Sequence, residues 1–112
     1  MTTAVVDVTV DDRSVGIAVS GEVDLANAAT VEDQIVAAIT NQVASVSVDL
    51  SAVDYMDSAG MRILFALASR LAGLQIAFEV VAPFGSSARR LVEVSGLALL
   101  VALRPPMDRA AG

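Results

Sequence analysis

The stretch VSVDLSAVDYMDSAGMRILFAL, residues 46–67, contains the two patterns that decide the fold. Its first half is rich in valine, which is typical of a buried β-strand. Its second half places apolar residues at helical spacing, with Met61, Leu64, Phe65 and Ala68 on one face. The segment DYMDSAGM (54–61) between them therefore predicts a loop that leads directly from a strand into a helix.

The flanking sequence predicts an α/β fold with the element order β-β-α-β-α-β-α-β. Alternating apolar residues indicate strands over 4–10 and 14–21, which we expect to pair as a hairpin. Further strands are expected over 44–53, 74–82 and 97–103, and helices over 28–40, 59–72 and 86–96. Because strands joined through helices lie parallel, we expect a mixed sheet opened by an N-terminal hairpin and covered by helices.

Several individual residues receive expectations from the local pattern. We expect Asn27 to cap the first helix. Arg89 and Arg90 fit the solvated face of the last helix. Tyr55 and Met56 are interpreted as packing residues at the base of the loop.

The length of 112 residues fits one domain, which we assign to residues 1–104, followed by a flexible tail over 105–112. The N-terminal sequence lacks the basic start and long apolar run of a signal peptide. We also find no stretch of about 20 nearly uncharged apolar residues that could span a membrane. We therefore expect a cytoplasmic protein.

The composition excludes most enzyme classes. The chain has no cysteine, histidine or lysine, which removes Cys nucleophiles, a Ser-His-Asp triad, a Schiff-base lysine and a P-loop lysine. Its 13 acidic residues and 7 arginines give a net charge of −6, which disfavours nucleic acid and anionic membranes as partners. We expect no enzymatic activity and no cofactor.

Four aspartates could suggest a magnesium site of the phosphoaspartate type: Asp24, Asp49, Asp54 and Asp57. Aspartates are common at strand ends and helix caps, however, and the lysine that such receiver-type sites use is missing. We therefore expect no metal site.

Ser58 lies where the predicted strand meets the helix, and three roles are open to it. A catalytic nucleophile would need a base, and the chain has no histidine to provide one. A helix cap, formed by Asp57 or Ser58, is the simplest interpretation of the local pattern. A phosphorylation site is also physically reasonable, because a helix N-terminus tolerates the added negative charge.

Three segments in this order make the chain resemble the STAS family, and in particular its bacterial anti-sigma factor antagonists. They are GEVDLANAATVEDQI (21–35), VSVDLSAVDYMDSAGMRILFAL (46–67) and ARRLVEVSGL (88–97). The resemblance covers about residues 4–103, and it implies the STAS fold.

The resemblance also implies a switch that has no catalysis of its own. In such family members, the serine of a D-S-x-G motif is phosphorylated by an anti-sigma factor that is also a kinase; here that serine is Ser58. The unphosphorylated form binds the anti-sigma factor and frees the sigma factor, phosphorylation blocks binding, and a serine phosphatase restores it. The implied contact residues are Asp24, Asp57, Ser58, Ala59, Gly60, Met61 and Arg62.

One departure from the family pattern sharpens this assignment. Relatives with the motif D-S-S-G have a second serine, which is replaced here by Ala59, so that one hydroxyl remains. Two alternatives stay open at this point. The chain could be a STAS subunit that supports the ATPase of an ABC-type lipid transporter, or a module that binds its partner constitutively.

Overall fold

The computed structural model describes residues 3–107, and its elements follow the predicted order. The last helix and the last strand are separated by one short 3-10 helix. The elements are β1 (Ala4–Asp11), β2 (Ser14–Val23), α1 (Ala28–Ala37), β3 (Ser45–Met56), α2 (Ser58–Gly73), β4 (Ala77–Val81), α3 (Ser87–Ser95), η1 (Leu97–Leu99) and β5 (Ala102–Arg104).

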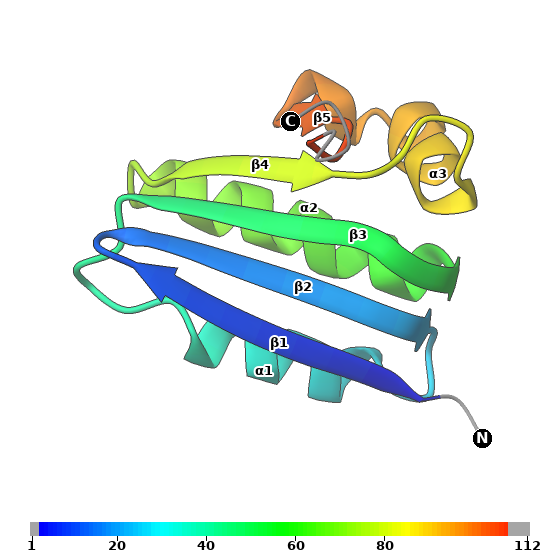
Figure 1. The fold of residues 1–112 in the computed structure, drawn as a ribbon, viewed down its shortest axis with the longest axis horizontal. Coiled ribbons are helices and arrows are strands. Elements are labelled where there is room, and N and C mark those ends of the chain that lie inside the picture. The colour runs from blue at the N-terminus through cyan, green and yellow to red at the C-terminus, as the bar shows by residue number, and fades with distance from the viewer. Residues whose placement is uncertain (1–2, 108–112) are drawn as a thin grey trace.

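The strands form one sheet in the order β1-β2-β3-β4-β5, which is a mixed sheet as predicted (Figure 1). β1 pairs antiparallel with β2, whereas β2, β3, β4 and β5 pair in parallel. The carboxyl ends of β2, β3 and β4 consequently lie at one end of the sheet, on the right in Figure 1. Three loops that lead into helices meet at that end.

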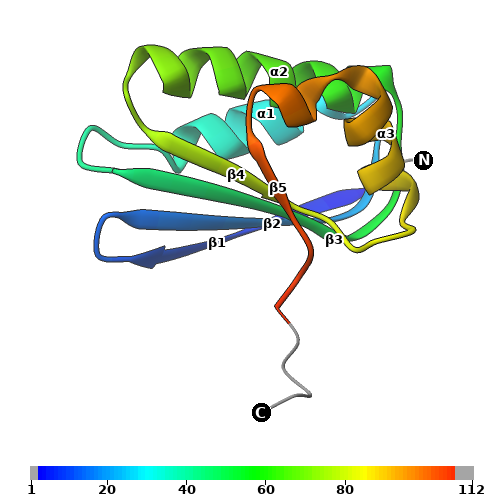
Figure 2. The same ribbon diagram turned by 90° about the horizontal axis from the view of Figure 1, so that it is seen from above.

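Helices α1 and α2 cover one face of the sheet and leave the other face open (Figure 2). The core lies between these helices and the sheet, and the strands contribute to it the alternating apolar residues that the sequence indicated. On β2, Val15, Ile17 and Val19 are buried, and on α1 the buried residues are Val31 and Ile35. Helix α2 contributes Met61, Ile63, Leu64, Leu67, Ala68 and Leu71 to the same cluster.

The boundaries of α1, β3 and β4 differ from the predicted ones by up to three residues, and the last predicted strand and one predicted cap are wrong. Helix α1 ends at Ala37 instead of 40, and the expected strand over 97–103 is largely a 3-10 turn, with only residues 102–104 extended. The amide of Leu100 donates to the carbonyl of Leu97, so local helical bonds replace a longer ladder. Asn27 occupies the N-cap position of α1, but its side chain bonds Glu22 and Asp24 in the preceding loop instead of capping the helix.

Residues 105–107 form no regular secondary structure and are exposed, and the rest of the predicted tail, 108–112, lies outside the described residues. The flexible tail therefore stays a prediction. No helix within residues 3–107 is long and apolar enough to cross a membrane.

Candidate functional site at the carboxyl end of the sheet

Helix α2 begins at this end of the sheet with an aspartate cap and an exposed serine. The Asp57 Oδ1 accepts hydrogen bonds from the amide of Ala59 at 2.9 Å and from that of Gly60 at 3.4 Å. Two of the free amides of the first turn are thereby satisfied. Ser58 is the first helical residue and is exposed, and its hydroxyl makes no hydrogen bond to any residue between 3 and 107. Of the two predicted caps, Asp57 is the one the structure has.

Asp24 lies beside this helix start, as the sheet register requires. Val23 pairs with Met56, and the amide of Asp57 donates to the carbonyl of Val23 at 3.2 Å. The Asp24 side chain accepts a hydrogen bond from the amide of Ala26 at 2.9 Å, which shapes the loop between β2 and α1. The structure thus brings together Asp24 and Asp57, which are far apart in the sequence.

Three of the predicted contact residues are buried. Ala59, Gly60 and Met61 face inward, whereas Ser58 and Arg62 are exposed. Gly60 is needed for this packing, because a Cβ there would lie 2.3 Å from the Cγ of Met56. These residues can hold the helix start close to the sheet, and only Ala59 among them lines a surface groove.

That groove lies between the first turns of α1 and α2 and has a volume of about 210 Å³. Arg62 lines it together with Leu25, whose side chain is 80% exposed. The remaining lining residues are Ala28, Ala29, Glu32, Ala59 and Ile63. Leu25 was not among the predicted site residues; a leucine inside the polar loop GEVDLANA is the signal that could have indicated it.

Two packing expectations at this end of the sheet are wrong. Tyr55 does not pack at the loop base: it is 50% exposed. Arg89 does not face solvent: it is only 8% exposed. Its Nη1 donates to the carbonyl of Ala82 at 2.9 Å, and its guanidinium lies 4.1 Å from the ring centroid of Phe84. Arg90 is exposed as predicted.

The Nε of Arg89 lies 3.5 Å from the Oε2 of Glu93. This is close enough for attraction between the opposite charges, but the buried Nε makes no hydrogen bond. Glu93 therefore pairs with an arginine that is buried in the protein.

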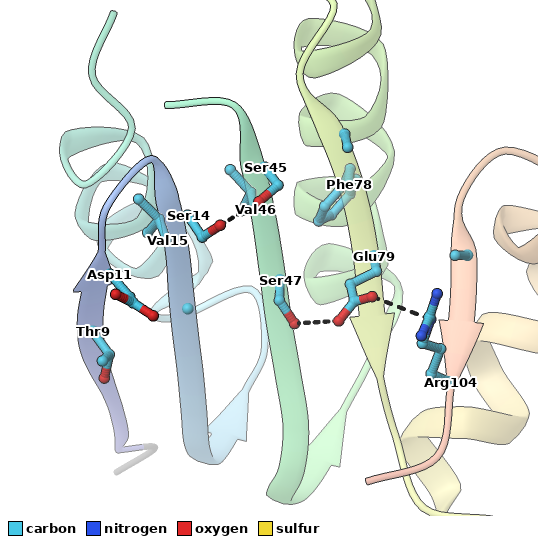
Figure 3. Close-up of a pocket in the computed structure, with 13 residues that line it drawn as sticks. Thr9, Asp11, Ser14, Val15, Ser45, Val46, Ser47, Phe78, Glu79 and Arg104 are labelled. Carbon is cyan, nitrogen blue, oxygen red and sulfur yellow. Dashed lines mark hydrogen bonds and ion pairs between the residues drawn. The ribbon is translucent and has the colours of Figure 1, made fainter. Parts of the chain in front are cut away.

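A wider hollow of about 520 Å³ lies on the open face of the sheet, at the opposite end of the parallel strands (Figure 3). Its polar side chains on β2, β3, β4 and β5 pair with one another. Ser14 and Ser45 share a hydrogen bond of 2.8 Å, and Glu79 accepts from Ser47 at 3.0 Å and pairs with Arg104 at 3.2 Å. None of the predicted site residues lines this hollow. We therefore place the candidate site at the start of α2.

The four aspartates considered as a metal site do not form one cluster. Among residues 3–107, no group of three or more acidic residues is arranged so that it could hold a metal ion. Asp49 instead accepts hydrogen bonds from the amide and hydroxyl of Ser51, at 2.8 and 2.6 Å.

Comparison with known proteins identifies the family to which this chain is similar. The sequence profile of the STAS domain matches residues 5–110. The chain is 38% identical over 95 residues to the anti-sigma-F factor antagonist RsfB of Mycobacterium tuberculosis, covering 82% of this chain and 75% of the relative.

Solved structures show the same fold. An anti-sigma factor antagonist from Mycobacterium paratuberculosis superposes with a TM-score of 0.84 at 31% identity, covering 97% of this chain and 92% of the other. The unphosphorylated anti-sigma factor antagonist SpoIIAA superposes with a TM-score of 0.75 at 19% identity, covering 96% and 92%. The chain therefore belongs to the STAS domain family, as its sequence motifs indicated, and its relatives there include anti-sigma factor antagonists.

Proposed function

We propose that this protein is an anti-sigma factor antagonist controlled by phosphorylation of Ser58. Its unphosphorylated form binds an anti-sigma factor and so frees a sigma factor. The observation that carries the proposal is the exposed, unbonded hydroxyl of Ser58 beside the Asp57 cap, in a chain 38% identical to an anti-sigma-F factor antagonist. The protein acts by binding, in the cytoplasm, and uses no catalysis of its own.

The geometry of the helix start suits Ser58 for modification by a kinase. Because Asp57 caps the helix, the Ser58 hydroxyl is not needed to satisfy backbone amides and is free to react. The neighbouring residue is Ala59, which has no hydroxyl and is buried. A kinase that docks at this end of the sheet therefore meets one serine hydroxyl in the motif.

A phosphate on Ser58 changes the charge of this surface more than its shape. It adds a charge of about −1.5 to −2 next to the carboxylates of Asp57 and Asp24. The helix N-terminus favours negative charge, and Arg62 follows at the i+4 position on the same helix, so the fold accepts the phosphate. A partner pressed against this surface would have to bury the new charge, which is costly. Phosphorylation thus opposes binding and leaves the fold intact.

SpoIIAA, a protein of this fold, has been solved in unphosphorylated and phosphorylated forms. The two forms superpose on this chain with TM-scores of 0.75 and 0.72. Both values support a fold that persists when phosphate is present. We further propose that the anti-sigma factor that binds this chain is also the kinase that phosphorylates Ser58, and that a serine phosphatase reverses the modification.

Variants of Ser58 test the proposal. We expect Ser58→Ala to bind the anti-sigma factor kinase encoded in the same genome as tightly as the wild type does, and Ser58→Asp to bind at least tenfold more weakly, a change of about 1.4 kcal/mol. Ser69→Asp is the matched control, because Ser69 is an exposed serine three turns further along α2. Isothermal titration calorimetry measures all three affinities. Equal affinity of Ser58→Ala and Ser58→Asp would instead indicate a constitutive binding module.

A further inference from the structure

The outer edge of β1 is a long strand edge that nothing in residues 3–107 covers. β1 is the first strand of the sheet, and no described segment lies beyond it in either view (Figures 1 and 2). Its sequence, AVVDVTVD, contains no lysine, proline or glycine, and it pairs with β2 without a register shift. Natural edge strands are commonly protected by short length, charged side chains, proline or bulges, and of these β1 has only the charges of Asp7 and Asp11. The opposite edge shows this protection, since β5 spans only Ala102–Arg104 and is followed by two prolines.

The register of the hairpin determines which backbone groups point outward. The carbonyl of Thr3 accepts a hydrogen bond from the amide of Glu22, directly opposite in the register. Hydrogen-bonded residues alternate along an antiparallel pair, so Val5, Asp7 and every second residue after them face β2. The amides and carbonyls of Val6, Val8 and Val10 therefore point away from the sheet, where a further strand could bind.

The side chains of the same three valines are also incompletely covered. They pair with Val19, Ile17 and Val15 of β2, so they lie on the face that carries the helices. Even so, Val8 is 44% and Val10 is 66% exposed. Outward backbone groups and uncovered apolar side chains thus coincide on one stretch of β1.

We infer that β1 is a dimerisation edge, at which two copies of this chain join their sheets through antiparallel β1 strands. The two-fold axis passes through Val8, so that Val8 faces Val8 of the partner subunit and Val6 faces Val10 of the partner subunit. This pairing satisfies the outward backbone groups of all three valines in each copy, with about six hydrogen bonds. It also brings the exposed valine side chains of the two copies together.

Charge and backbone geometry select this register. Only registers that pair the outward-facing residues with one another form hydrogen bonds, which allows symmetry axes from Val6 to Val10. An axis at Val6 pairs Val8 with Ala4 of the partner subunit, and an axis at Val10 pairs Val8 with Asp12 of the partner subunit, so both pair fewer of the three valines with one another than an axis at Val8 does. An axis at Asp7 places that carboxylate opposite its own copy, and an axis at Thr9 places Asp7 opposite Asp11 of the partner subunit. Like charges directly opposite one another are destabilising. With the axis at Val8, Asp7 faces Thr9 of the partner subunit and no two carboxylates are opposed.

The dimer should be weak, and its association constant should rise with salt concentration. A single strand edge buries less than the roughly 1,000 Å² that a stable interface needs. Each copy also carries a net charge of −6, so the two copies repel one another at low ionic strength. Added salt screens this repulsion without affecting the backbone hydrogen bonds.

Sedimentation velocity on the full chain, over a range of protein and salt concentrations, tests the inference. We expect a monomer–dimer equilibrium that shifts toward dimer as salt rises. Val8→Lys and Val8→Pro should weaken it at least tenfold. The proline removes only an outward-facing amide, so it leaves the hairpin ladder intact. Val94→Lys, at an exposed valine of α3, should leave the equilibrium unchanged.

A cysteine variant tests the position of the symmetry axis. The chain has no native cysteine, so Val8→Cys introduces a single thiol. Opposed Cα atoms in a hydrogen-bonded antiparallel pair are about 5.5 Å apart, which is within the range that a disulfide spans. We expect Val8→Cys to form covalent dimers under mild oxidation faster than Val94→Cys does. A wild type that stays monomeric at millimolar concentration in high salt would overturn the inference, as would a dimer that the Val8 variants do not weaken.

Discussion

Helices α2 and α3 both begin at the carboxyl end of the sheet, yet their first turns are built differently. Each helix follows a parallel strand, has a polar N-cap residue, and has an exposed serine as its first residue, Ser58 in α2 and Ser87 in α3. At α3 the arginine of the first turn is used inside the protein, where Arg89 bonds a carbonyl, pairs with Glu93 and stacks on Phe84.

At α2 the arginine of the first turns makes no such contacts within the described part of the chain and remains accessible from outside. The nearest arginine, Arg62, is exposed and forms no ion pair within residues 3–107. It lines an open groove beside the exposed side chain of Leu25. The comparison indicates that the start of α3 stabilises the fold, whereas the start of α2 is available to a partner.

The largest expected difference in stability is between the two arginines. Arg89→Ala removes a charged hydrogen bond to Ala82 and the stacking on Phe84, and we expect it to lower the free energy of unfolding by about 2–3 kcal/mol. Arg62→Ala, on the exposed surface, should change it by no more than about 0.5 kcal/mol. Urea unfolding followed by circular dichroism measures both, with Arg90→Ala as an exposed control on α3. Equal effects of Arg89→Ala and Arg62→Ala would contradict the comparison.

The two N-caps should make similar and smaller contributions. Asp57→Ala leaves the amides of Ala59 and Gly60 without their acceptor, and Ser86→Ala does the same to the amide of Arg89. We expect each change to lower the free energy of unfolding by about 1 kcal/mol. Asp57→Asn, which keeps an acceptor oxygen, should lower the free energy of unfolding by less than Asp57→Ala does. If Asp57→Ala proved neutral in the same urea experiment, the aspartate would not be a structural cap.

The smallest predicted effect is on the second pKa of a phosphate attached to Ser58. In protein made with phosphoserine at position 58, we expect the positive charge of Arg62 to lower the second pKa of the phosphate by a few tenths. Phosphorus NMR over a pH series detects this as a higher pKa in Arg62→Gln than in the otherwise unchanged phosphoprotein. Arg70→Gln, an exposed arginine two turns further along the same helix, is the control and should leave the pKa unchanged. If Arg62→Gln and Arg70→Gln changed the phosphate pKa equally, the effect would come from the net charge of the protein and not from the position of Arg62.

Much of this architecture could be predicted from local sequence patterns. The order of strands and helices followed from apolar spacing, because alternation and helical periodicity are properties of short segments. The predicted range of the last helix, 86–96, also agrees with the structure, in which the Ser86 hydroxyl accepts from the amide of Arg89 and Gly96 has a positive φ of 88°.

The features that were missed depend on contacts between distant segments. A pair of arginines on a short helix is typical of a solvated face, and nothing local shows that Arg89 folds under Phe84. The groove near Ser58 is formed by α1 and α2, which are separated by the whole of β3. Its position beside Ser58 appears only when the parallel sheet aligns the two helix starts.

The most direct test of the central claim is phosphosite mapping after the chain is incubated with ATP and the anti-sigma factor kinase encoded in the same genome. Ser87 is the matched hydroxyl, since it also begins a helix at this end of the sheet and is exposed. We expect one phosphate per chain, on Ser58, in the wild type and in Ser87→Ala, and none in Ser58→Ala. Phosphate on Ser87 at a comparable rate, or no phosphate on Ser58 from a kinase that binds the chain, would contradict it.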